Sequence, residues 1–113
     1  MGDDTSTTYT AITYNFCELA ELRKEKFITK WVDELKDEIT AVYMNDKIHV
    51  VSSVCPHFGG DFAVDLKKGE MRCKWHDWTF CIDGGQCTNR NLKTKLRQYE
   101  FFEQNGSLII RAS

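Results

Sequence analysis

The chain has 113 residues, 42% of them hydrophobic and 28% charged, and its formal net charge is −2. This composition is typical of a soluble globular protein, and we expect one domain over residues 1–113. The small net charge indicates neither nucleic acid nor an acidic membrane surface as a partner, and no apolar run approaches the length of a membrane span. The first ten residues are polar and acidic and do not resemble a secretory signal.

Short strands joined by turns are predicted for most of the chain. Residues 11–16 indicate a first strand, residues 17–22 a turn or short helical segment, and residues 26–32 a second strand. Residues 39–44 and 48–54 are predicted to pair as a β-hairpin around an Asn-Asp-Lys turn. The second strand of this hairpin runs directly into the first of two motifs that carry metal-binding side chains.

The C-terminal part of the chain contains two further turn signals. Residues 83–86 read Asp-Gly-Gly-Gln and indicate a tight turn. The pair Asn105-Gly106 separates residues 96–102 from residues 108–111, and Asn-Gly is a strong signal for a hairpin. These elements together predict an all-β fold of antiparallel strands.

Two short motifs combine thiols with imidazoles. The first, Cys-Pro-His, supplies Cys55 and His57, and the second, Cys-Lys-Trp-His, supplies Cys73 and His76. Residues 58–72 separate the two motifs. Two thiolates suit one iron and two neutral imidazoles suit a second, which is the ligand set of a Rieske two-iron, two-sulfur cluster.

The sequence around these motifs extends the match. Residues 55–62 read CPHFGGDF and residues 73–86 read CKWHDWTFCIDGGQ. Together they resemble the Rieske family pattern of C-x-H, a spacer and C-x-x-H. The WHDWTF segment is most similar to soluble Rieske ferredoxins and to the N-terminal domains of ring-hydroxylating oxygenases. The resemblance implies a small antiparallel β-sandwich with an inserted cluster-binding lobe at about residues 55–80.

The resemblance also implies a role for each of the four side chains. Cys55 and Cys73 are expected to bind the inner iron of a Rieske 2Fe-2S cluster, and His57 and His76 the outer iron near the protein tip. The only proline of the chain, Pro56, lies between two of these ligands and restricts the backbone there.

A Cys2His2 zinc site is the chemical alternative, because zinc accepts the same side chains. Structural zinc sites usually pair cysteine with cysteine about two to four residues apart, and histidine with histidine about three to five apart. Each motif here mixes the two types, which favours the iron–sulfur cluster. Visible colour distinguishes the cluster from zinc, and also from a chain whose thiols and histidines bind no metal.

The function that the resemblance implies is one-electron transfer without catalysis. A ferredoxin of this kind passes electrons from a flavin-dependent ferredoxin reductase to a terminal oxygenase, and we expect it in the cytoplasm. An oxygenase domain needs a mononuclear iron held by two histidines and a carboxylate, and only His49 remains after the ligands are assigned. The alternatives left open are a Rieske domain or small subunit of a larger oxygenase or reductase, a redox sensor, and a structural zinc module.

Three cysteines, Cys17, Cys81 and Cys87, are not assigned to the cluster. Their odd number argues against a disulfide framework, although Cys81 and Cys87 flank a predicted turn and could form a bridge across it. We expect reduced thiols, as is usual in the cytoplasm.

Three differences from the family concern the second motif and the residues after it. Asp77 stands where the family usually has glycine, and its carboxylate lies either near the cluster or toward solvent. Trp78 and Phe80 stand where high-potential relatives place serine and tyrosine hydroxyls, which predicts a midpoint potential near the bottom of the Rieske range, about −150 mV. Residues 88–92 lack the proline of the loop that covers the cluster in many relatives, which predicts a looser cover.

The remaining predictions concern single side chains. His49 is expected to be a half-exposed strand residue rather than a ligand, and Trp31 and Trp78 are expected to be buried. Trp75 is an exception to the expected burial. It lies inside the second motif, where it could reach the protein tip. A positive group in the same region consists of Lys67, Lys68, Arg72 and Lys74. It is either a solvated face or a surface that attracts an acidic partner.

Overall fold

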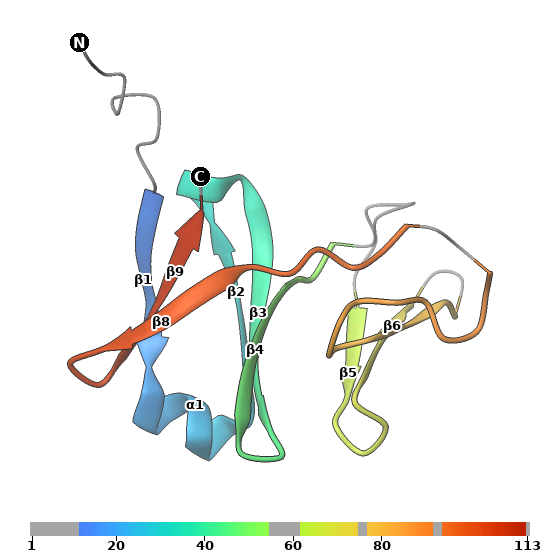
Figure 1. Ribbon diagram of the computed structural model, residues 1–113, viewed down its shortest axis with the longest axis horizontal. Coiled ribbons are helices and arrows are strands. Elements are labelled where there is room, and N and C mark those ends of the chain that lie inside the picture. Colours follow the sequence, from blue (N-terminus) through green and yellow to red (C-terminus); the bar gives the residue numbers. More distant parts are fainter. Residues whose placement is uncertain (1–11, 55–61, 75–76, 92–93, 113) are drawn as a thin grey trace, which may run out of the picture.

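The computed structural model describes residues 12–54, 62–74, 77–91 and 94–112. These residues form nine strands and one short α-helix, together with a 3-10 helix at Asp33–Leu35. The strands build three antiparallel sheets of three strands each (Figure 1). The predicted all-β fold of antiparallel strands is confirmed.

The first sheet pairs the two ends of the described chain. Its order is β1-β9-β8, with these strands at Ile12–Glu18, Ser107–Ala112 and Glu100–Gln104. The turn between β8 and β9 is formed by Asn105 and Gly106, whose φ angles of 53° and 79° suit the tight hairpin turn that Asn-Gly favours. The predicted C-terminal hairpin therefore forms, but its first strand begins later than expected.

The second sheet contains the other predicted hairpin. Its order is β2-β3-β4, with strands at Phe27–Val32, Asp37–Met44 and Lys47–Ser52. A two-residue turn at Asn45 and Asp46 joins β3 to β4, and both turn residues have positive φ angles. Asparagine and aspartate tolerate this conformation better than most residues, so local turn chemistry accounts for the hairpin.

Helix α1 and the first two sheets enclose the larger core. The helix spans Leu19–Glu25 and buries Leu19 and Leu22 on one face, so the predicted turn or helical segment is a helix that begins after β1 ends. In the described part of the chain, no helix is long and apolar enough to cross a bilayer. The other buried side chains of this core include Phe16, Val32, Ile39, Ala41, Val50, Leu108 and Ile110.

The third sheet lies beside β4 in Figure 1 and has the order β5-β6-β7. Its strands span Phe62–Asp65, Glu70–Cys73 and Thr79–Cys81. A second apolar core joins this sheet to the second one and consists of Val42, Val51, Met71, Phe80, Ile82 and Leu96.

The second sheet is the middle layer, because both of its faces are buried. On β3, Ala41 packs in the first core while the next residue, Val42, packs in the second. On β4, Val50 and Val51 divide in the same way, as expected for successive strand residues that point to opposite faces. The third sheet, which carries Cys73, is therefore packed against a sheet that is itself held from both sides.

Residues 96–99 cross from the third sheet back to the first. The Tyr99 N–H donates to the Val50 carbonyl at 2.8 Å, so this segment runs along β4. The predicted strand over residues 96–102 is therefore wrong in its first half, because these residues connect two sheets and β8 begins only after them.

Trp31 departs from the expected burial. Its side chain is 56% exposed on the edge strand β2, while the next residue, Val32, is fully buried and points to the opposite face. The prediction that Trp31 is buried is therefore wrong. Trp78 is half-buried, and Trp75 lies outside the described residues.

Candidate metal centre

Of the four predicted ligands, Cys73 lies within the described residues, whereas Cys55, His57 and His76 lie outside them. Cys73 is the last residue of β6 and is fully buried. Its partner on β5 is Phe62, the first described residue after the first motif. The chain that follows the first motif thus returns to the third sheet directly beside Cys73.

Backbone hydrogen bonds close the second motif into a tight loop. The Cys73 N–H donates to the Trp78 carbonyl at 2.7 Å, and the Asp77 N–H donates to the Cys73 carbonyl at 2.9 Å. Both bonds involve the backbone of Cys73, so Asp77 and Trp78 are held at the end of β6. The described residues on either side of the second predicted histidine ligand are therefore bonded to each other.

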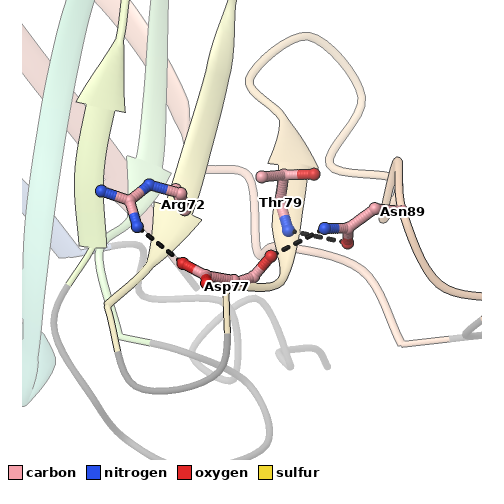
Figure 2. Close-up of polar contacts among 4 residues, drawn as sticks. All are labelled: Arg72, Asp77, Thr79 and Asn89. Atoms are coloured by element: carbon pink, nitrogen blue, oxygen red, sulfur yellow. Dashed lines mark hydrogen bonds and ion pairs between the residues drawn. The ribbon is translucent and has the colours of Figure 1, made fainter.

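Asp77 has a φ angle of 56°, which lies in the left-handed region. Glycine adopts this region most easily, and aspartate is among the few other residues that tolerate it. This explains how aspartate can occupy the position where the resemblance implies glycine. The carboxylate is 77% exposed and accepts a bond of 2.7 Å from Arg72 Nη1 (Figure 2), so it lies toward solvent but is held by an ion pair.

Asn89 contacts the same loop from the segment that follows β7. Its Nδ2 donates to the Asp77 carbonyl at 2.7 Å, and its Oδ1 accepts from the Thr79 N–H at 3.0 Å (Figure 2). The contacts of Asn89 were not predicted from the sequence, because the prediction for residues 88–92 rested on their lack of proline. An asparagine a few residues after a predicted turn gives little indication by itself of such a contact.

The strand that leads into the first motif is anchored by two buried serines. Ser52 Oγ donates to Asp37 Oδ1 at 3.0 Å, and Ser53 Oγ donates to Glu38 Oε1 at 3.2 Å. The Ser53 N–H also donates to the Glu38 carbonyl at 2.8 Å. These contacts hold the chain until two residues before Cys55. They were not predicted, although two adjacent serines directly after the apolar pair Val50 and Val51 were a usable signal.

Asp37 also binds the segment that crosses between the sheets. Tyr99 Oη donates to Asp37 Oδ2 at 2.6 Å. Burial, followed by the hydrogen bond to Asp37, raises the pKa of Tyr99. The hydroxyl therefore keeps its proton at neutral pH and remains a donor. One carboxylate thus connects the end of β4 and residues 96–99 to β3.

The predicted positive group is divided between two places. Lys67 and Lys68 lie in the turn between β5 and β6, whereas Lys74 lies at the opposite end of this hairpin, next to the second motif. Arg72 is already paired with a carboxylate. The four cations therefore do not form one continuous surface at the motif.

The three cysteines outside the motifs are free thiols. Cys17 is buried in the first core, and this burial is the main cause that raises the pKa of its thiol. A protonated, buried thiol is unreactive. Cys81 and Cys87 are half-buried and form no bridge with each other.

Phe80 contributes apolar packing to the third sheet. It is fully buried in the second core, and its ring meets that of Phe62 edge-on with centroids 5.7 Å apart. It has no hydroxyl to donate. The nearby Thr79 hydroxyl is engaged in a hydrogen bond with the Thr88 hydroxyl.

His49 is half-buried on β4, opposite Val42 on β3, as expected for a strand residue. Burial is the main cause that lowers its pKa. Lys47 acts in the same direction, and Asp83 opposes it. The folded protein therefore favours the neutral imidazole.

We expect His49→Gln to make the fold less sensitive to acid. The pKa of histidine in an unfolded chain is about 6.5, and that of His49 is lower in the folded protein. The unfolded chain thus binds the proton first, so the free energy of unfolding falls as the pH drops below about 6.5. Denaturant titrations at about pH 7.5 and about pH 5.5 should show a larger loss for the unaltered protein than for the variant. Equal losses would contradict a contribution from His49.

Residues 13–100 match the family model of the Rieske [2Fe-2S] domain. The chain belongs to this family. Its cofactor is therefore a Rieske-type 2Fe-2S cluster, which favours iron–sulfur chemistry over the zinc alternative. The matched region begins in β1 and ends at the first residue of β8, so it includes both motifs and the whole third sheet.

Three proteins show how this chain relates to others of known sequence or structure. The oxygenase component of 3-ketosteroid-9-alpha-monooxygenase from Rhodococcus rhodochrous is 33% identical over 73 residues, which are 58% of this chain and 18% of that protein. The plasma membrane Rieske protein PetC3 from Synechocystis PCC 6803 has a TM-score of 0.74 at 18% identity, covering 88% of this chain and 99% of that one. The ferredoxin of carbazole 1,9a-dioxygenase from Nocardioides aromaticivorans IC177 has a TM-score of 0.72 at 18% identity. This match covers 89% of this chain and 98% of the ferredoxin.

The matches cover very different fractions of the other proteins' lengths. The chain spans 18% or less of the length of the curated relatives that it matches. It spans nearly the full length of the two solved structures, whose low identity shows a shared fold.

The described residues fit the cluster that the family requires. The Cys73 thiol is buried at the end of a strand, and Phe62 beside it leads back to the first motif. The positive φ of Asp77 lets the chain turn directly after the second histidine position. Hydrogen bonds with the Cys73 backbone keep Asp77 and Trp78 in place, and the described cysteines form no disulfide with one another.

Proposed function

We propose that this chain is a one-electron carrier in which Cys55 and Cys73 bind the inner iron, and His57 and His76 the outer iron. The observation that supports this most directly is the buried Cys73 at the closed loop, in a chain that matches the Rieske family. When bound, the cluster supplies reversible uptake of one electron, with no substrate bond made or broken.

The described residues next to the predicted ligands are held by hydrogen bonds. Ser52 and Ser53 fix the strand before the first motif, and the Cys73 backbone closes the second. Ligands that move little when the charge of a site changes require little rearrangement of their surroundings. We propose that this rigidity favours rapid electron transfer.

We further propose that the electron passes from a flavin-dependent ferredoxin reductase to a terminal oxygenase. The carbazole dioxygenase ferredoxin shares the fold over 98% of its length, and the sequence is 33% identical to part of an oxygenase component. A cytoplasmic location accompanies this proposal, because the free thiols Cys17, Cys81 and Cys87 suit a reducing compartment.

A second candidate is a Rieske domain or subunit of a larger oxygenase. It is favoured by the match to an oxygenase component, because the aligned region makes up only 18% of the length of that protein. The length of the native gene product distinguishes the two. A product of about the present length supports a single Rieske domain over residues 1–113, whereas a longer product with a second iron site supports an oxygenase.

The test is electron paramagnetic resonance of the purified full chain after reduction with dithionite. We expect a Rieske signal, with a lower average g value than that of an all-cysteine cluster, because two nitrogen ligands replace two sulfurs. His76→Ala should remove this signal. A colourless and iron-free protein, or a signal unchanged by His76→Ala, would overturn the proposal.

Voltammetry and turnover examine the carrier role in the same preparation. Because Phe80 offers no hydroxyl to the cluster, we expect a midpoint potential of about −150 mV, and a value above about +100 mV would contradict this. With NADH and a flavin-dependent ferredoxin reductase, the protein should be reduced and reoxidised repeatedly. A redox sensor would instead change its affinity for a partner.

A further inference from the structure

The segment after β7 pairs with that strand and then loses its backbone partner. Phe80 and Cys87 form an antiparallel bridge, and the Thr88 N–H donates to the Thr79 carbonyl at 2.7 Å. In a regular antiparallel pair, the Thr79 N–H would bond to the backbone of the neighbouring strand. Here it bonds to the side chain of Asn89 instead.

The Asn89 carboxamide occupies the place of a strand neighbour. Its oxygen accepts from the Thr79 N–H, and its NH2 group donates to the Asp77 carbonyl, so it satisfies the backbone groups on both sides of Trp78. The Cys87 thiol also lies 3.7 Å from the same oxygen. Only a side chain with both an acceptor and a donor can make both backbone bonds at once.

Asp77 is consequently held through three of its groups, and Figure 2 shows the two contacts made by its carboxylate and its carbonyl. Its N–H is bonded to Cys73, its carboxylate to Arg72 and its carbonyl to Asn89. The first two partners, Cys73 and Arg72, belong to β6, and Cys73 is itself a predicted ligand. Asn89 is the partner that comes from outside the strands of the third sheet, so it ties the following segment to the end of the loop.

We propose that Asn89 is a positioning residue for the second ligand loop, and that it fastens the segment after β7, whose residues 88–92 lack the family's proline. The inference rests on the proposed role of His76, which directly precedes Asp77. By fixing the Asp77 carbonyl, Asn89 limits rotation of the backbone that follows the histidine. The missing proline predicted a looser segment over the cluster. The hydrogen bonds of the Asn89 side chain would then hold this segment in place of the proline.

The expected effect falls on the cluster rather than on overall stability. The bonds of Asn89 lie at the surface, where water can replace them when the side chain is shortened. Groups that orient metal ligands typically change metal affinity by about 10–100-fold when they are removed. We therefore expect Asn89→Ala to bleach about tenfold faster in EDTA, at an unchanged unfolding midpoint.

The experiment compares full-length, cluster-containing variants by bleaching rate in EDTA, g values, midpoint potential and unfolding midpoint. Asn89→Ala should bleach fastest and show shifted g values and an altered potential. Asn89→Asp keeps the acceptor for Thr79 but loses the donor to Asp77, so it should fall between Asn89→Ala and the unaltered protein. Asn91→Ala is the control, because this exposed asparagine of the same segment makes no hydrogen bond to the described residues.

The inference fails if Asn89→Ala matches the unaltered protein in bleaching and g values, or if Asn91→Ala has the same effect. It also fails if bleaching rates follow the unfolding midpoints, which would indicate a general structural role. If Asn89→Ala retains no cluster, the comparison is made with Asn89→Asp. Absence of a Rieske signal in the unaltered protein would overturn the proposed function itself, whereas a normal signal with unaffected Asn89 variants would overturn this inference alone.

Discussion

Cys73→Ala should abolish the visible absorption and the iron content of the purified protein. Cys73 is fully buried at the end of β6, and its backbone closes the loop that leads to His76. In the proposed site it supplies one of the two thiolates of the inner iron, and a metal held by so few ligands is lost when one is removed. Alanine introduces neither a larger side chain nor a charge, so the loss would report the missing thiolate.

Cys81→Ala is the matched control for this prediction. Cys81 is a half-buried free thiol on β7, in the same sheet as Cys73. This variant should keep its colour and its iron, as measured by visible spectra and chemical iron analysis. Full iron content in Cys73→Ala would refute the ligand assignment. Loss of iron from both variants would show that disturbance of the third sheet, rather than of a ligand, removes the cluster.

Gly85→Ala should destabilise the fold by about 2–5 kcal/mol. Gly85 has a φ angle of 83°, and its carbonyl accepts the Leu96 N–H at 2.8 Å. An added Cβ would lie 2.3 Å from the Leu96 carbonyl oxygen, which is backbone and cannot turn away. The left-handed conformation costs about 1–2 kcal/mol for a residue with a Cβ, and overpacking adds about 1–3 kcal/mol.

Gly106→Ala separates these two contributions. Gly106 has a similar φ angle of 79°, but an added Cβ would meet no atom within 4 Å. We therefore expect only the backbone cost of about 1–2 kcal/mol for this variant. Urea denaturation of both variants measures the difference. Equal losses of the free energy of unfolding would show that the contact between Gly85 and Leu96 is not tightly packed.

The contact between Gly85 and Leu96 also affects the metal centre. Leu96 is buried in the second core, which joins the third sheet to β3 and β4. A shift of Leu96 would loosen the attachment of the sheet that carries Cys73. We expect Gly85→Ala to bind its cluster less firmly than Gly106→Ala, for a reason unrelated to any ligand.

The cofactor chemistry and the hairpins were predictable from local patterns of residues. Two thiols and two imidazoles at short, regular spacing define the ligand set, because ligand type and spacing are local properties. The Rieske family and its cluster are confirmed, while the assignment of the individual ligands stays a prediction. The turns at Asn45-Asp46 and Asn105-Gly106 were also predictable, since a positive φ angle is satisfied by the turn residues themselves.

The pairing of surfaces was not predictable, because it depends on how the sheets pack on one another. Adjacent valines such as Val50 and Val51 look alike in the sequence, yet they belong to different cores because two sheets cover β4 from opposite sides. The exposure of Trp31 follows from its place on an edge strand, which composition does not reveal. The contact of Asn89 with Asp77 joins residues that are separated in the chain, and only the path of the backbone brings that carboxamide to the ligand loop. Contacts of this kind depend on how distant segments pack together, and no local pattern of residues specifies them.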